Sequence, residues 1–153
     1  MTVAIPSAVR RAIVAHARRD RPHECCGLLI GRGRRIDFAY PMANIAARPA
    51  TRYRVDDAAH LELRRVLRQL TPPLAIVGVY HSHPSGPARP SERDVREAHY
   101  PDWMHVIVGF HGRRALIYAC HMRGRRVTAL RIVPRLTTGD RRRPRRAPRG
   151  GRS

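Results

Sequence analysis

The chain contains no lysine, so all 31 of its basic residues are arginines, against 11 aspartates and glutamates. The resulting formal net charge of +20 is typical of proteins that neutralise phosphate groups and release their counterions. The complete absence of lysine, however, indicates a coding bias towards arginine as much as selection for a nucleic-acid partner. Many arginines also lie in periodic segments, where a solvated face is the ordinary reason for them. Charge alone therefore does not establish nucleic-acid binding.

Long apolar runs are also missing. No stretch approaches the roughly 18 consecutive apolar residues that a membrane-spanning helix needs. Arg10 and Arg11 interrupt the apolar residues near the N-terminus, which does not fit a secretory signal peptide. Three cysteines, Cys25, Cys26 and Cys120, cannot form a disulfide framework. We therefore expect a cytoplasmic protein with no membrane partner.

A chain of 153 residues is long enough for one domain with a buried core and too short for a large barrel enzyme. Apolar residues recur at helical spacing from Ser7 to Arg19, with Ser7 as the expected N-cap, and a second helix is expected from Asp56 until Pro72. The sequence thus predicts an α/β fold, a single domain with a mixed sheet flanked by helices. The expected strands are 24–31, 34–42, 74–83, 103–110, 114–121 and 126–133, with a short helix over 91–99.

The last residues differ in composition from the rest. The stretch RRRPRRAPRGGRS has no apolar residue except alanine, and its like charges repel one another. We assign residues 1–136 to the domain and expect 137–153 to be a disordered, Arg-rich tail. Such a tail could bind nucleic acid or an acidic partner weakly and non-specifically. A merely solvated terminus accounts for it equally well.

The stretch HSHPSGPARPSERD, residues 81–94, concentrates the groups capable of chemistry. His81 and His83 end a buried strand two residues apart, so their side chains point to one face and can converge on one ion. The Pro/Gly loop then turns the chain, which lets Asp94 approach the same point. Two histidines and a carboxylate make a catalytic zinc set, since three protein ligands leave a fourth position for a water whose pKa falls to about 7.

Residues 81–94 are also open to different interpretations. Ser91 and Asp94 fit the S-x-x-[DE] pattern of a helix capping box, and a loop histidine is usually just polar surface. A zinc deaminase would need H-x-E followed by P-C-x-x-C, whereas this chain has H-x-H and no C-x-x-C. A barrel amidohydrolase also uses H-x-H but needs about 250 residues. A non-catalytic interaction or nucleic-acid-binding module with a basic tail remains an alternative.

Together with Glu24 in HECCGLLIG, residues 81–94 resemble the JAMM/MPN (JAB domain) family of zinc metalloproteases. They reproduce its H-[ST]-H-x7-S-x-x-D signature at all positions, and the resemblance to the prokaryotic stand-alone members covers roughly residues 3–133. It implies a cytidine-deaminase-like fold in which Zn²⁺ is held by His81, His83 and Asp94. It also implies that Glu24 moves the proton of the attacking water to the leaving amine. Ser91 would donate a hydrogen bond to the oxyanion.

The resemblance also implies a substrate class. Family members hydrolyse the bond after the C-terminal Gly-Gly of ubiquitin or ubiquitin-like proteins, and simple prokaryotic members are associated with small sulfur carriers. We therefore expect a metallopeptidase or isopeptidase acting on a ubiquitin-like sulfur carrier, for example in cysteine biosynthesis, where the enzyme frees a cysteine built on the carrier. Cys25 and Cys26 are expected to be small core or near-site residues and not ligands, because the ligand set is complete without them.

Overall fold

Seven strands form one mixed sheet in the computed structural model, which describes residues 1–136; the predicted tail over 137–153 lies outside the described residues. The strand order is β1-β3-β2-β4-β5-β6-β7, and the sheet closes into a barrel. The closing strand, β1 (Thr2–Ala4), pairs in parallel with β7 and touches β3 through the pair Ala4–Arg35. The sequence did not predict β1, since three residues are too few to show an alternating pattern.

The six predicted strands are all present. Gly33, with a φ of 56°, makes the expected turn between β2 and β3, a backbone conformation that glycine adopts without a steric penalty. β2 pairs antiparallel with both β3 and β4, β4 and β5 run parallel, and β5, β6 and β7 form an antiparallel meander. The bounds are β2 Cys26–Arg32, β3 Arg35–Met42, β4 Ala75–His83, β5 Met104–His111, β6 Arg114–Arg123 and β7 Arg126–Val133.

Three helices join these strands, α1 (Ser7–Asp20), α2 (Asp57–Arg68) and α3 (Glu92–Arg96). Asp56 caps α2, and its side chain accepts a hydrogen bond from the backbone N–H of Ala59. The predicted N-cap role of Ser7 is wrong, because Pro6 occupies that position and Ser7 Oγ instead accepts a hydrogen bond from Arg10. α3 is shorter than predicted: none of its residues is fully buried, so little packing supports a longer helix.

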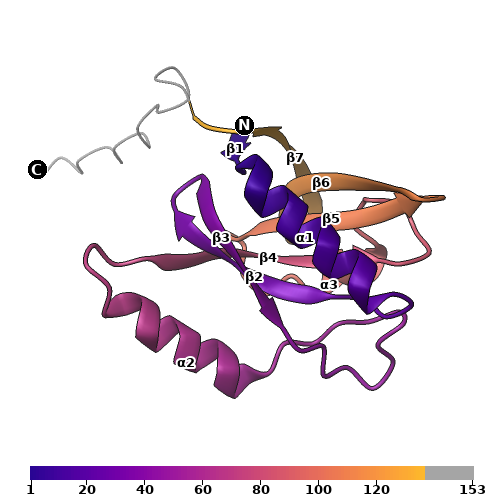
Figure 1. The fold of residues 1–153 in the computed structure, drawn as a ribbon, viewed down its shortest axis with the longest axis horizontal. Helices are drawn as coiled ribbons and strands as arrows, with labels where there is room; N and C mark the ends of the chain where they lie inside the picture. The colour runs from indigo at the N-terminus through magenta and orange to yellow at the C-terminus, as the bar shows by residue number, and fades with distance from the viewer. Residues whose placement is uncertain (137–153) are drawn as a thin grey trace, which may run out of the picture.

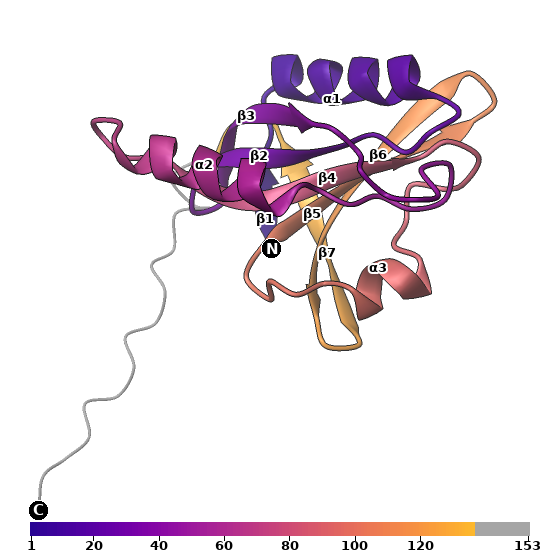
Figure 2. The ribbon, with the colours of Figure 1, turned by 90° about the horizontal axis from the view of Figure 1, so that it is seen from below.

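The helices lie on opposite sides of the sheet, as Figure 2 shows for α1 and α3. Alternation along the strands explains this arrangement. Leu29 of β2 and Tyr80 of β4 face α1 and form the largest cluster of buried residues, whereas Leu28 and Val79 face the other way. Leu63 of α2 packs against this second cluster, and Figure 1 shows α2 away from α1. The candidate site lies on the side of α2 and α3.

Two further predictions concern the core and the membrane. Cys25 and Cys26 are fully buried with free thiols, and Cys120 is buried as well, so the predicted core placement of the first two is confirmed. Within residues 1–136, none of the helices is both long enough and apolar enough to cross a membrane.

Candidate active site and metal centre

The register of β4 places both motif histidines. His81 lies between Cys26 of β2 and Ile107 of β5, and it is fully buried, with 0% of its surface exposed. His83 ends the strand opposite Gly109 and is partly buried. Because the two residues are separated by one position, their rings lie on the same side of the sheet, with centroids 4.9 Å apart. The predicted convergence of the histidine pair is therefore present.

The Pro/Gly loop orients His83. The backbone of this loop packs so closely on β5 that a Cβ at Gly109 would lie 2.1 Å from the Ala88 nitrogen. The backbone N–H of Phe110 also donates a hydrogen bond to the Gly86 carbonyl. This position holds the Pro87 carbonyl 3.0 Å from His83 Nδ1. A carbonyl oxygen only accepts hydrogen bonds, so Nδ1 carries the hydrogen. In the neutral ring the lone pair is then on Nε2, which faces the site.

Asp94 has two roles at once. Its Oδ2 accepts hydrogen bonds from the Ser91 backbone N–H at 2.6 Å and from the Ser91 hydroxyl at 2.7 Å. Ser91 Oγ in turn accepts from the backbone N–H of Asp94 at 3.1 Å, so the predicted capping box is formed. The same carboxylate faces both histidines. The structural and the chemical interpretations of the motif therefore hold together rather than exclude each other.

Three donor atoms converge at this point. The Nε2 atoms of His81 and His83 are 3.1 Å apart, and they lie 3.2 Å and 3.3 Å from the two carboxylate oxygens of Asp94. One ligand atom from each of the three residues falls within 4.8 Å of the others. Two imidazole nitrogens and a carboxylate oxygen are donors that Zn²⁺ accepts. The residues present therefore fit a metal ion of this kind.

The electrostatics of two of the three donors, Asp94 and His81, suit a cation. Burial alone would raise the pKa of Asp94, but hydrogen bonds from His81 and His83 outweigh it and hold that pKa well below its usual range. Burial lowers the pKa of His81 below its ordinary value, which favours the neutral ring that a metal requires. For His83, burial is outweighed by the hydrogen bonds to Asp94 and Pro87, and the pKa rises.

Glu24 lies beside this cluster, two residues before β2 begins. Its backbone N–H donates to the Pro49 carbonyl at 2.8 Å, and its own carbonyl accepts from the Asn44 side chain at 2.9 Å. Only 7% of the residue is exposed, and within residues 1–136 its carboxylate has no hydrogen-bond or ion-pair partner. Burial raises its pKa to about 7, against the opposing charge of His83. A carboxyl group that titrates there can both accept and return a proton near neutral pH.

Comparison with known proteins identifies the family. The family model described as prokaryotic homologs of the JAB domain matches residues 6–120. The chain belongs to this prokaryotic JAB family. The matched segment includes Glu24 and residues 81–94 and lies within the assigned domain, 1–136, whose exact bounds stay a prediction.

Relatives of this JAB-family chain include named peptidases. A probable TtuB-protein conjugate cleaving protease of Thermus thermophilus is 36% identical over 115 residues, 74% of each chain. The CysO-cysteine peptidase of Mycobacterium tuberculosis is 41% identical over 99 residues, which are 63% of this chain and 66% of the relative. With such relatives, the JAB-family chain is a JAMM-type hydrolase.

Solved structures agree on the fold. A protein of Desulfitobacterium hafniense, known from its solution structure, matches with a TM-score of 0.76 at 27% identity, over 86% of this chain and 92% of that one. A JAB1/MPN domain protein from Archaeoglobus fulgidus matches with a TM-score of 0.53 at 20% identity, over 86% and 97%. The fold is therefore the mixed α/β fold of JAB/MPN proteins, while the closer likeness to cytidine deaminases stays a prediction.

Two residues that the sequence analysis missed border the JAB-family site. The Tyr53 ring stacks on His81 with centroids 4.5 Å apart and planes inclined by 19°. His81 Nδ1 has no hydrogen-bond partner among the described residues, so the stacking on Tyr53 supplements the contact of Nε2 with Asp94 in holding the ring. His105 is only 4% exposed, and burial lowers its pKa to about 4, which keeps it neutral. Neither residue belongs to the motif, and only the tertiary structure brings them to it.

Asn44 organises the loop of residues 43–56, which covers the site between β3 and α2. Its side-chain amide donates to the carbonyls of Glu24 and Arg52, at 2.9 Å and 2.8 Å. Its side-chain oxygen accepts from the backbone N–H groups of Ala46 and Arg54, both at 3.0 Å. One side chain thus satisfies four backbone groups and ties the loop to Glu24, beside the candidate metal-binding cluster of His81, His83 and Asp94.

Proposed function

We propose that this JAB-family hydrolase cleaves the bond after the C-terminal Gly-Gly of a ubiquitin-like sulfur-carrier protein, with Zn²⁺ held by His81, His83 and Asp94. One observation carries the proposal: Glu24, only 7% exposed and with its pKa raised to about 7, lies beside three converging metal donors. Ionising a mostly buried carboxylate costs free energy, and groups whose pKa is raised in this way concentrate at catalytic sites. The names of the relatives, which include a conjugate-cleaving protease and a CysO-cysteine peptidase, support the same class of substrate.

Each residue of the motif would have a separate role. When bound, zinc polarises the scissile carbonyl and lowers the pKa of water to about 7. Glu24 would accept a proton from the attacking water and later give it to the leaving amine, for which a pKa of about 7 is well matched. The Ser91 hydroxyl, which here donates to Asp94, would turn to the oxyanion of the tetrahedral intermediate.

The preference for Gly-Gly has a steric basis. Residues 84–91 form a loop next to a sheet, a setting in which an extended peptide can lie along the strands. Glycine has no side chain, so a Gly-Gly pair can approach the metal-binding cluster without collision. A carrier with Ala-Ala in place of Gly-Gly should therefore be a poor substrate.

The biological setting follows from the same proposal. We infer that the enzyme acts in the cytoplasm and that the released group is an amino acid such as cysteine, as in cysteine biosynthesis. A non-catalytic interaction module is a weaker alternative, because an interaction surface has no use for a mostly buried Glu24 with a raised pKa beside three metal donors.

Replacing Glu24 by Gln tests the function. Glutamine keeps the size of the side chain but cannot take a proton from water. Zinc content, measured by metal analysis, and folding should therefore be retained while turnover of a carrier-Gly-Gly-cysteine fusion falls at least roughly a hundredfold. The wild-type protein and an Ala-Ala carrier are the controls. Near wild-type turnover by Glu24→Gln would rule out the mechanism. Equal cleavage of the Ala-Ala carrier would rule out the specificity for Gly-Gly.

A further inference from the structure

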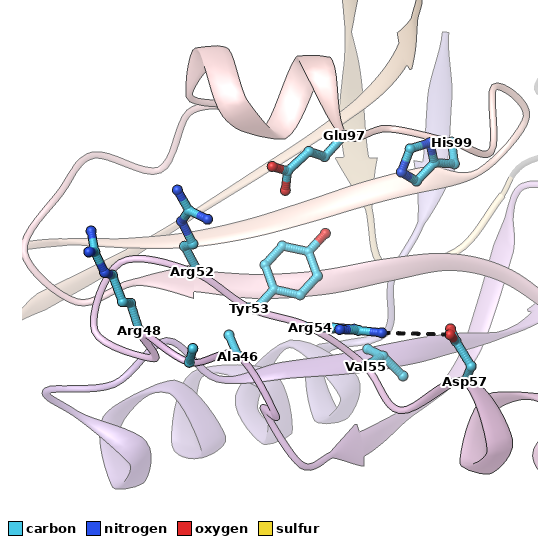
Figure 3. Close-up of a pocket in the computed structure, with 10 residues that line it drawn as sticks. Ala46, Arg48, Arg52, Tyr53, Arg54, Val55, Asp57, Glu97 and His99 are labelled. Carbon is cyan, nitrogen blue, oxygen red and sulfur yellow. Dashed lines mark ion pairs between the residues drawn. The ribbon is translucent and has the colours of Figure 1, made fainter.

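A pocket of about 830 Å³ opens between the 43–56 loop and the segment that follows α3 (Figure 3). We call it the arginine pocket, because three of the residues that line it are arginines. Tyr53, Glu97 and His99 also line it. The arginines are Arg48, Arg52 and Arg54, all of them exposed.

The arginine pocket adjoins the catalytic residues. Tyr53, which lines it, stacks on His81. Pro49, in the same loop, accepts the backbone hydrogen bond of Glu24. On the other side, Arg93 of α3 donates to the Thr51 carbonyl at 2.9 Å and so joins the loop to the helix that carries Asp94. A substrate bound at the metal-binding cluster would therefore extend into this pocket.

Two of the three arginines lack an internal counter-charge. Arg54 faces Asp57 at 4.0 Å, whereas the guanidinium groups of Arg48 and Arg52 have no hydrogen-bond or ion-pair partner within residues 1–136. Figure 3 shows Arg48 and Arg52 on the same side of the pocket, with Glu97 on the helix side. No ion pair joins Glu97 to either arginine in the described part of the chain. Arg48 and Arg52 are thus free to bind an anion from outside.

We propose that Arg48 and Arg52 bind acidic side chains of the carrier, in the segment that precedes its Gly-Gly. The inference rests on the proposed function, since it assigns a substrate segment to the neighbourhood of the same site. Guanidinium groups bind carboxylates with paired hydrogen bonds and stay charged at all physiological pH values. Gly-Gly itself offers no charge, so discrimination among carriers must come from residues further along the chain.

The size of the pocket favours the carrier over the released amino acid as the source of the carboxylate. A volume of about 830 Å³ is in the range of pockets that accept drug-sized ligands, and it accommodates several residues rather than a single cysteine. The net charge of +20 would also attract an acidic carrier at long range.

Binding of short peptides tests the proposal without depending on turnover. One fluorescent peptide has four glutamates followed by a free Gly-Gly terminus, and its partner has four glutamines instead. Wild-type protein should bind the glutamate peptide about fivefold more tightly, since exposed ion pairs are individually weak. The ratio should approach one in R48A/R52A and at high salt. R11A/R18A is the matched control: it removes two exposed arginines from α1, on the other side of the sheet, and should keep the wild-type ratio.

Three results would overturn the proposal. The first is an equal affinity of the wild type for both peptides, and the second is an unchanged ratio in R48A/R52A. The third uses the glutamine peptide extended by one cysteine, prepared with either a free carboxylate or an amide at its C-terminus. If the wild type binds the free acid more tightly than the amide, and R48A/R52A loses this preference but not the preference for glutamate over glutamine, the pocket binds the released residue instead. Cleavage of the extended peptides by the wild type is scored separately. Its absence contradicts the proposed function but leaves the binding ratio interpretable.

Discussion

Adding one methyl group at Gly109 should disturb the metal-binding cluster without changing any of its ligands. A Cβ there would lie 2.1 Å from the Ala88 nitrogen and 2.3 Å from the Pro87 carbonyl carbon. Non-bonded atoms of this kind need about 3.5 Å, so the loop must move away by more than about 1 Å. The 3.0 Å hydrogen bond between Pro87 and His83 Nδ1 would then be lost. Overpacking of this kind costs about 1–3 kcal/mol of folding free energy.

The loss of that hydrogen bond should also weaken metal binding. Removing the partner that orients a ligating histidine typically lowers metal affinity about 10–100-fold. Chelator competition with Zn²⁺ would measure this loss in Gly109→Ala, and thermal denaturation of the metal-free protein would measure the stability change. Gly86→Ala is the control, because its Cβ would meet His83 Cβ at an ordinary 3.4 Å. If Gly109→Ala matches Gly86→Ala in both measurements, the loop does not orient His83.

The other predictions address single groups of the site. His83→Ala should abolish the binding of about one zinc per chain that a three-ligand site implies, and full zinc content by metal analysis would move the site elsewhere. Ser91→Ala should lower turnover by an amount equivalent to about 3 kcal/mol and stability by about 1 kcal/mol. If only one of the two falls, Ser91 has only the corresponding role, as oxyanion donor or as helix cap. Tyr53→Phe should keep wild-type zinc affinity while Tyr53→Ala weakens it, because the ring rather than the hydroxyl contacts His81. Metal-free Glu24→Gln should gain stability over the wild type as pH rises from about 4.5 to about 7, because the raised pKa of Glu24 means that ionisation of this carboxyl destabilises the native state. If the difference in melting temperature between the two proteins stays constant across this range, the assigned burial is contradicted.

Periodicity and turn residues were sufficient to predict most of the fold. Strands such as β4 and β7 carry continuous or alternating apolar residues, and Gly33 marks a turn, so their bounds were predicted within a few residues. The short β1 and the early end of α3 could not be predicted, because tertiary pairing and the lack of packing decide them.

The site was predictable only in part. Spacing alone predicts that the three donors of the motif converge, because strand alternation and a capped helix are local rules. Tyr53, His105 and the arginine pocket come from a loop and a neighbouring strand whose positions depend on long-range contacts. Asn44 looks like an ordinary polar loop residue in the sequence, and only its four hydrogen bonds reveal its role.

The carboxylate of Asp94 links ligand geometry to local order. A helix of five residues such as α3 cannot persist on its own, and the capping box supplies much of what holds its first turn. Because Asp94 Oδ2 serves that box and also faces His83, fixing the carboxylate at an ion should slow the opening of α3. Amide hydrogen exchange of residues 92–96 then becomes a local reporter of metal occupancy, set apart from the slow exchange of the central strands.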